Sequence, residues 1–186
     1  MIFGKTFVFV HVPKTGGQSV SLALPGGKSV EAMHRPRFAT DAGDRKAFGF
    51  VRNPWDRMVS LYAFMCQKPV PPSFADRQRE MKDNGFKWWL TQDRYFMDQD
   101  TLFKCPIPMQ RRPQTWWLTG CDLVGRFESI GADFKRICEE LKITAVDLPH
   151  INRSRHAAYR EYYDAEARAF VAEHFRTDIE RYGYAF

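Results

Sequence analysis

The sequence contains few cysteines, and their spacing excludes two common roles for them. None of the four forms a CxxC pair, so a zinc site of the usual spacing is not expected and we predict no metal centre. A chain of 186 residues can build a hydrophobic core without disulfides. We therefore expect reduced thiols in the core at all four positions, which are Cys66, Cys105, Cys121 and Cys138.

The chain also lacks a long apolar run. The stretch MIFGKTFVFVHVPK at residues 1–14 is too short and too interrupted for a signal peptide or a membrane-spanning helix. No other segment approaches the ~20 consecutive apolar residues that a spanning helix needs. These features predict a cytoplasmic protein with no membrane span.

Internal repeats and low-complexity segments are absent as well. Hydrophobic residues make up 44% of the chain, which is typical of a folded core and argues against a disordered chain. Length and composition together predict a single domain over residues 1–186.

Acidic residues are outnumbered, with 22 Asp and Glu against 28 Lys and Arg, which gives a net charge of +6. An excess of positive charge favours anionic partners, and nucleic acid, a nucleotide or an acidic glycan would each fit. Solubility alone also accounts for such a surface. The basic residues are spread along the chain rather than gathered on one helix, so a non-catalytic nucleic-acid binder is the weaker alternative and we expect no nucleic-acid partner.

Short apolar runs alternate with helical segments. Residues 7–10 are apolar on both faces, which is typical of a central strand in a parallel sheet. Asn53 and Pro54 form a helix start, with the asparagine as the N-cap and the proline in the first helical position. The patterns predict strands at 7–10, 47–51 and 123–127, and helices at 18–24, 54–67, within 73–100, and at 114–118, 132–142 and 164–182. This alternation predicts an α/β domain with three layers, in which helices flank a parallel sheet.

A glycine-rich loop follows the first predicted strand and precedes a predicted helix. Backbone N–H groups at a helix start can bind an anion, and Gly16 and Gly17 let it approach without obstruction by a Cβ atom. Lys14 adds a positive charge, while Thr15 and Ser19 add hydroxyl donors. The lysine precedes the glycines, unlike in the GxxxxGK[ST] loop, so a conventional ATP or GTP site is not expected. The loop indicates a phosphate site, with an ordinary strand-to-helix turn as the alternative.

A second anion site is indicated at the end of the second predicted strand. Arg52 follows the apolar residues 47–51 directly, and Ser60 lies about two turns into the next helix. An arginine at a strand end can bind a phosphate through two N–H groups. Considered alone, Arg52 is equally explained as an arginine that caps a helix or forms a salt bridge, and Ser60 as an ordinary residue on a helix face. Two such strand ends in one small domain favour a ligand site, because open α/β sheets bind ligands at the carboxyl ends of their strands.

Two segments resemble the donor-binding motifs of the sulfotransferases. HVPKTGGQS, at residues 11–19, resembles their 5′-phosphosulfate-binding loop, and VRNPWDRMVSLY, at residues 51–62, resembles their 3′-phosphate-binding segment. The later segments PQTWWLTG, VGRFESIGADF, HINRSR and DIERYGYAF agree in order, so the resemblance extends over nearly the whole chain. The chain is more similar to the carbohydrate branch, which includes the heparan and chondroitin sulfate sulfotransferases and their bacterial relatives. This likeness indicates a bacterial or viral origin.

The resemblance implies a P-loop-NTPase-like fold and a specific sulfate donor. That donor is 3′-phosphoadenosine 5′-phosphosulfate (PAPS), which leaves adenosine 3′,5′-bisphosphate as the product and needs an anion site at each end of its ribose. The charge of Lys14 is also implied to act in catalysis, by offsetting negative charge on the bridging oxygen as the sulfuryl group leaves. The resemblance assigns the 5′-phosphosulfate to the loop residues and the 3′-phosphate to Arg52 and Ser60; the loop residues are Lys14, Thr15, Gly16, Gly17, Gln18 and Ser19. Arg153 and Arg155 would close over the nucleotide or are solvated loop charges.

An acceptor hydroxyl must lose its proton as it attacks the sulfur, and histidine is suited to that role at neutral pH. His34 lies in the segment EAMHRPRF, where some relatives carry a histidine base, and it is the first candidate, with an ordinary surface loop histidine as the alternative. Glu31 is the fallback base. Arg35 and Arg37 would steer an acidic acceptor or are solvated loop charges. The other histidines are further candidates: His11 is expected to shape the phosphate loop, His174 to pack in the core, and His150 and His156 to flank the INRSR loop.

The resemblance indicates a carbohydrate hydroxyl as the acceptor, while a lipid-linked sugar, a small alcohol and the oligomeric state stay open. The competing enzyme class is a nucleotide kinase or another P-loop phosphotransferase, which would use ATP with Mg²⁺. The position of the lysine before the glycines, and the lack of a clear metal-binding carboxylate after a strand, count against that class.

Overall fold

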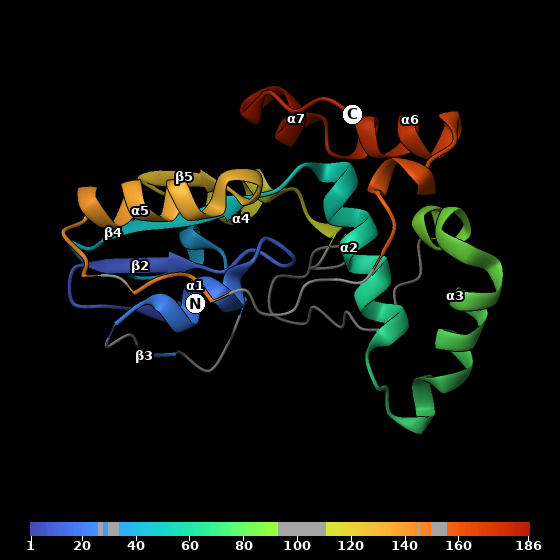
Figure 1. Cartoon of the computed structure of the whole chain (residues 1–186), viewed down its shortest axis with the longest axis horizontal. Coiled ribbons are helices and arrows are strands. Elements are labelled where there is room, and N and C mark those ends of the chain that lie inside the picture. Colours follow the sequence, from blue (N-terminus) through green and yellow to red (C-terminus); the bar gives the residue numbers. More distant parts are fainter. Residues whose placement is uncertain (26–27, 30–33, 93–110, 145, 150–155) are drawn as a thin grey trace. The chain divides into compact units, whose positions relative to one another are not determined.

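The computed structural model describes residues 1–25, 28–29, 34–92, 111–144, 146–149 and 156–186. The chain forms two compact units, each built from two segments (Figure 1). The first unit contains Met1–Arg52 and Gln114–Arg153, and the second contains Asn53–Pro113 and Ser154–Phe186. That these units make up one domain over 1–186 stays a prediction, and they are described in turn.

The first unit is built on a five-stranded sheet with the strand order β3-β1-β2-β4-β5. The three predicted strands are confirmed as β2, β4 and β5, and they are parallel to one another. Two short strands extend the sheet, and β1 is antiparallel to both β2 and β3. At two residues each, β1 and β3 are too short to leave an apolar pattern in the sequence. The bounds are β1 Ile2–Phe3, β2 Phe7–Val10, β3 Lys28–Ser29, β4 Lys46–Val51 and β5 Leu123–Arg126.

Helices cover both faces of this sheet. Phe9 of β2 and Phe48 of β4 point to one face and pack in a single core with α1 (Gly17–Ala23) and α5 (Ile130–Glu140). The short helix α4 (Gln114–Leu118) lies against β4 from the other face, where a Cβ atom on Gly49 would come 2.4 Å from a methyl carbon of Leu118. The glycine therefore permits close packing of α4, and the predicted three-layer α/β architecture is confirmed.

The second unit is helical. It contains α2 (Pro54–Gln67), α3 (Pro72–Thr91), a 3₁₀ turn η4 (Tyr159–Tyr162), α6 (Ala165–His174) and α7 (Arg176–Tyr182). The predicted start of α2 is confirmed, because the Asn53 side chain accepts a hydrogen bond from the Trp55 N–H at 3.0 Å. The core of this second unit contains the side chains of Met58, Leu61 and Trp89. The predicted helix within 73–100 is α3, which is kinked at Gly85, where φ is 80°.

The prediction of one helix over 164–182 is wrong, because α6 and α7 are separate helices. The chain bends at Phe175, whose φ of −110° and ψ of 25° lie outside the helical range. The bend accompanies burial of the Phe175 ring in the same core as Ala167 and Val171, and full burial of such a ring contributes roughly 1.5–3 kcal/mol. The apolar periodicity continues through the bend, so the pattern alone did not reveal it.

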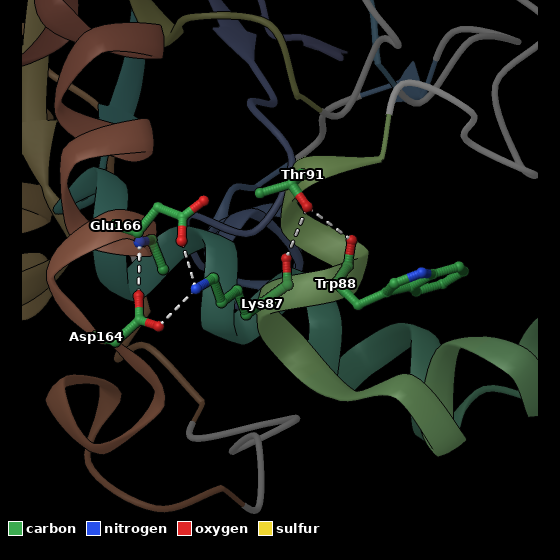
Figure 2. A network of polar contacts seen from close by, with 6 residues as sticks. Lys87, Trp88, Thr91, Asp164 and Glu166 are labelled. Atoms are coloured by element: carbon green, nitrogen blue, oxygen red, sulfur yellow. Dashed lines mark hydrogen bonds and ion pairs between the residues drawn. The ribbon is translucent and has the colours of Figure 1, made fainter.

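A surface ion-pair network joins α3 to the start of α6 (Figure 2). The Lys87 ammonium lies 2.8 Å from a carboxylate oxygen of Asp164 and 2.5 Å from one of Glu166. The other Asp164 oxygen accepts the Ala167 N–H at 2.8 Å and so caps α6. At the end of α3, the Thr91 hydroxyl lies 3.2 Å from the carbonyl oxygens of both Lys87 and Trp88. Because these charges face solvent, we expect the network to orient the two helices rather than to stabilise them strongly.

Within the described part of the chain, Cys66, Cys121 and Cys138 are free thiols. Cys138 is buried in the core as predicted, whereas Cys66 and Cys121 are only partly buried. Cys105 lies outside the described residues. No helix among the residues that the structure describes has the length and apolar character needed to cross a bilayer.

Candidate active site

The loop between β2 and α1 turns sharply at two positions. Lys14 has a φ of 68° and Gly16 a φ of 78°, which are left-handed values rare for a lysine. The Thr15 side chain between them is buried, and its hydroxyl donates to the Val12 carbonyl at 3.0 Å. The Thr15 hydroxyl proton is therefore engaged in holding the loop.

Packing requires both glycines of the loop, and backbone conformation also requires Gly16, whose φ is 78°. A Cβ atom on Gly16 would come 2.7 Å from Cδ1 of Ile130, the first residue of α5. A Cβ atom on Gly17 would come 2.0 Å from Cδ2 of His11. The loop thus rests directly on the His11 ring, which agrees with the expectation that His11 shapes it.

Arg52 lies beside this loop, at the carboxyl end of β4. Its Nη1 donates to the Lys14 carbonyl at 3.3 Å, and its guanidinium carbon lies 4.1 Å from the centre of the Phe127 ring. Burial, followed by repulsion from Arg52, lowers the pKa of Lys14 from 10.5 to about 8. Two positive groups from neighbouring parallel strands therefore lie together at one edge of the sheet, where an anion bound near both would relieve their repulsion.

A buried side chain holds the backbone of Arg52. Gln114, at the start of α4, accepts the Arg52 N–H through Oε1 at 2.8 Å and donates to the Arg52 carbonyl through Nε2 at 2.8 Å. Neither Gln114 nor Phe127 was predicted from the sequence to be part of the site. Both lie in segments that resemble the sulfotransferases, PQTWWLTG and VGRFESIGADF, but the residue type alone did not mark either one.

His34 lies next to His11, with the two ring centres 4.5 Å apart. The Nδ1 of His34 is 2.9 Å from the His11 carbonyl oxygen, which can only accept, so Nδ1 carries the proton. In the neutral ring Nε2 then holds the lone pair, which is the form that a general base needs. Burial, followed by the nearby charges of His34, the N-terminus and Lys14, lowers the pKa of His11 to about 3 and keeps it neutral.

Other predicted residues lie elsewhere. Gln18 and Ser19 are on the first turn of α1, with Gln18 exposed and Ser19 half-buried. Ser60 is buried on α2, in the second unit. Nη1 of Arg37 donates to the Thr40 carbonyl at 2.9 Å, whereas Arg35 is exposed. Four of the predicted site residues lie outside the described part of the chain, namely Glu31, His150, Arg153 and Arg155.

The two remaining histidines of the described chain make local contacts. Nδ1 of His156 lies 2.8 Å from the carbonyl of its neighbour Ala157. His174 is half-buried on α6, and its Nε2 lies 3.3 Å from the Arg111 carbonyl. Burial is the largest of the effects that lower the pKa of His174. The core interpretation of His174 therefore agrees with its contacts in the second unit, including the Phe170 ring, which stacks on the imidazole.

A concavity of about 360 Å³ is lined by Lys5, Thr6, Asp44 and Arg45. These residues precede β2 and β4, so the concavity lies at the amino ends of the strands, opposite the edge that carries Lys14 and Arg52. It is not part of the site. Among the described residues, no group of three or more His, Cys, Asp or Glu side chains is arranged to hold a metal ion.

Comparison with known proteins identifies the family. The family model for the sulfotransferase family matches residues 28–185, which include Arg52, Ser60 and Gln114 but not the loop at 14–19. A search of curated proteins found no match. The three-layer α/β fold agrees with the P-loop-like fold of that family and confirms the predicted fold class. On this match, which spans most of the sequence, the chain belongs to the sulfotransferase family.

Proposed function

We propose that this protein transfers a sulfuryl group from PAPS to a hydroxyl group of a carbohydrate. The observation that carries the proposal is the contact between the Arg52 guanidinium and the Lys14 carbonyl, in a chain of the sulfotransferase family. This contact brings the two cationic residues together at the carboxyl ends of adjacent parallel strands, where α/β sheets bind ligands. A nucleotide with an anionic group at each end of its ribose matches that arrangement of charge.

PAPS supplies an activated sulfuryl group joined to the 5′-phosphate through a bridging oxygen. In the proposal, the loop from Lys14 to Ser19 binds the 5′-phosphosulfate, and the Lys14 ammonium neutralises charge at the leaving oxygen. Arg52 and Ser60 bind the 3′-phosphate, while Arg153 and Arg155 close over the nucleotide. The lowered pKa of Lys14 supports this fit, because a bound anion would offset the repulsion from Arg52 that contributes to the shift.

On the acceptor side, His34 removes the proton from the attacking hydroxyl through Nε2. The hydrogen bond from Nδ1 to the His11 carbonyl supports this role, because it holds the ring in the required tautomer. The carbohydrate nature of the acceptor rests on the resemblance of the sequence to the carbohydrate branch of the family.

Sulfotransfer assays with PAPS and a panel of neutral and acidic glycans test the proposal. Lys14→Ala and Arg52→Ala are each expected to lower kcat/KM by 100-fold or more while the circular dichroism spectrum is retained. His34→Gln is expected to lower kcat by roughly 100-fold or more and to leave nucleotide affinity unchanged. Full turnover of PAPS by both the Lys14 and the Arg52 variants would reject the assignment of the donor site.

A further inference from the structure

The pairing of β4 with β5 ends at Val51, which lies opposite Arg126. Beyond that point, the N–H and carbonyl groups of Arg52 both bond to the Gln114 side chain, each at 2.8 Å. Gln114 is completely buried, with an exposed fraction of 0%. Its amide therefore extends the hydrogen-bond ladder of β4 by one residue, in place of a neighbouring strand.

This double contact needs the chemistry of an amide. Glutamine and asparagine alone carry an acceptor oxygen and a donor NH₂ in one neutral planar group, as a peptide unit does. An apolar residue at position 114 would remove the partner of two buried backbone groups of Arg52. Buried backbone groups without a partner are strongly disfavoured, so the strand end would shift to find other donors and acceptors.

A shift of the Arg52 backbone would also displace its guanidinium, which is the group proposed to bind the ligand. The guanidinium is held over the Phe127 ring and beside the Lys14 carbonyl, which requires the Arg52 backbone to stay where it is. We infer that Gln114 is a positioning residue of the donor site, which holds Arg52 so that its guanidinium and Lys14 face the same nucleotide. This inference rests on the proposed function, in which Arg52 binds the 3′-phosphate.

Binding of two nucleotides tests the inference. Adenosine 3′,5′-bisphosphate and adenosine 5′-monophosphate differ only in the 3′-phosphate, so the ratio of their Kd values reports on Arg52. We expect Gln114→Met, which keeps the side-chain length, to weaken binding of the bisphosphate roughly 10-fold or more and binding of the monophosphate much less. A purely structural role would weaken both equally. Leu118→Val, a buried change on the same helix, should lower Tm and leave the ratio unchanged.

A second variant, Gln114→Glu, keeps the inference testable if Gln114→Met does not fold. Gln114→Glu keeps an acceptor for the Arg52 N–H, but it can donate to the Arg52 carbonyl only when protonated. Its preference for the bisphosphate should therefore recover toward that of the wild type as pH falls, with both proteins measured at each pH. In the double variant Arg52→Ala/Gln114→Met, the loss of preference should be no larger than in Arg52→Ala alone.

The outcomes separate the two claims. Wild-type protein that binds neither nucleotide, or shows no preference for the bisphosphate, would overturn the proposed function and this inference with it. A preference that is lost in Arg52→Ala but fully kept in Gln114→Met would overturn the inference alone. If Gln114→Met does not fold, a wild-type preference in Gln114→Glu at every pH would have the same meaning.

Discussion

At the scale of single residues, the feature that matters most is the proximity of two like charges. Lys14 and Arg52 are 38 positions apart in sequence, yet a hydrogen bond joins the Arg52 side chain to the Lys14 backbone. Their repulsion, added to the burial of the lysine, lowers the Lys14 pKa to about 8. Lys14 is therefore still mostly protonated at pH 7 and titrates just above that, in the range where solution measurements are simple.

This shift predicts proton uptake on nucleotide binding. At pH 8 about half of the free protein carries a neutral Lys14, and a bound anion raises the pKa of the lysine, so binding should take up about half a proton. Calorimetry of adenosine 3′,5′-bisphosphate binding in buffers of different ionisation enthalpy measures the uptake, with Lys14→Met as the control that lacks it. Equal uptake by the variant and the wild type would contradict the assignment.

The same shift sets the sign of a stability change. The pKa of Lys14 is lower in the folded protein than its ordinary value of 10.5, so the unfolded chain binds more protons between about pH 8 and 10.5. The contribution of Lys14 to the free energy of unfolding therefore rises with pH across that window.

At the scale of elements, the loop between β2 and α1 depends on its packing against His11. Gly17→Ala would place a methyl group 2.0 Å from the His11 ring, and His11 is buried and cannot move aside freely. We expect this variant to lose about 1–3 kcal/mol of stability, as overpacked sites do, and to bind the bisphosphate more weakly. Urea unfolding and calorimetry measure the two effects. Gly131→Ala, where a Cβ would meet nothing within 4 Å, is the matched control on α5.

Most elements were predictable because they leave local patterns. The apolar run of β2, the apolar run of β4 and the Asn53–Pro54 helix start each involve only a few consecutive residues, so the sequence alone indicates each of them. The break at Phe175 was not predictable, because the apolar spacing continues on both sides of it. There, burial of one ring in a core formed by distant helices outweighs the continuity of a single helix.

At the scale of the whole molecule, the charge of +6 favours any polyanion, so binding of an anionic nucleotide alone does not identify the enzyme class. At 100 times its Kd, adenosine 3′,5′-bisphosphate should stabilise the fold by about 2.7 kcal/mol, which raises Tm by roughly 5–10 °C. ATP with Mg²⁺ at the same concentration and ionic strength should raise Tm much less. A larger shift with ATP and Mg²⁺ would favour the phosphotransferase alternative.

Local sequence patterns were enough to predict the order of strand, glycine loop and helix, the start of α2 and the presence of two cations after apolar strands. These features depend on neighbours along the chain, through side-chain periodicity, capping and the freedom of glycine. Tertiary packing brings distant groups together: Gln114 contacts the backbone of Arg52, 62 positions away, and His34 contacts the carbonyl of His11. Such contacts follow from how helices and loops pack around the sheet, because burial selects partners by position in space and by hydrogen-bonding capacity rather than by distance along the chain.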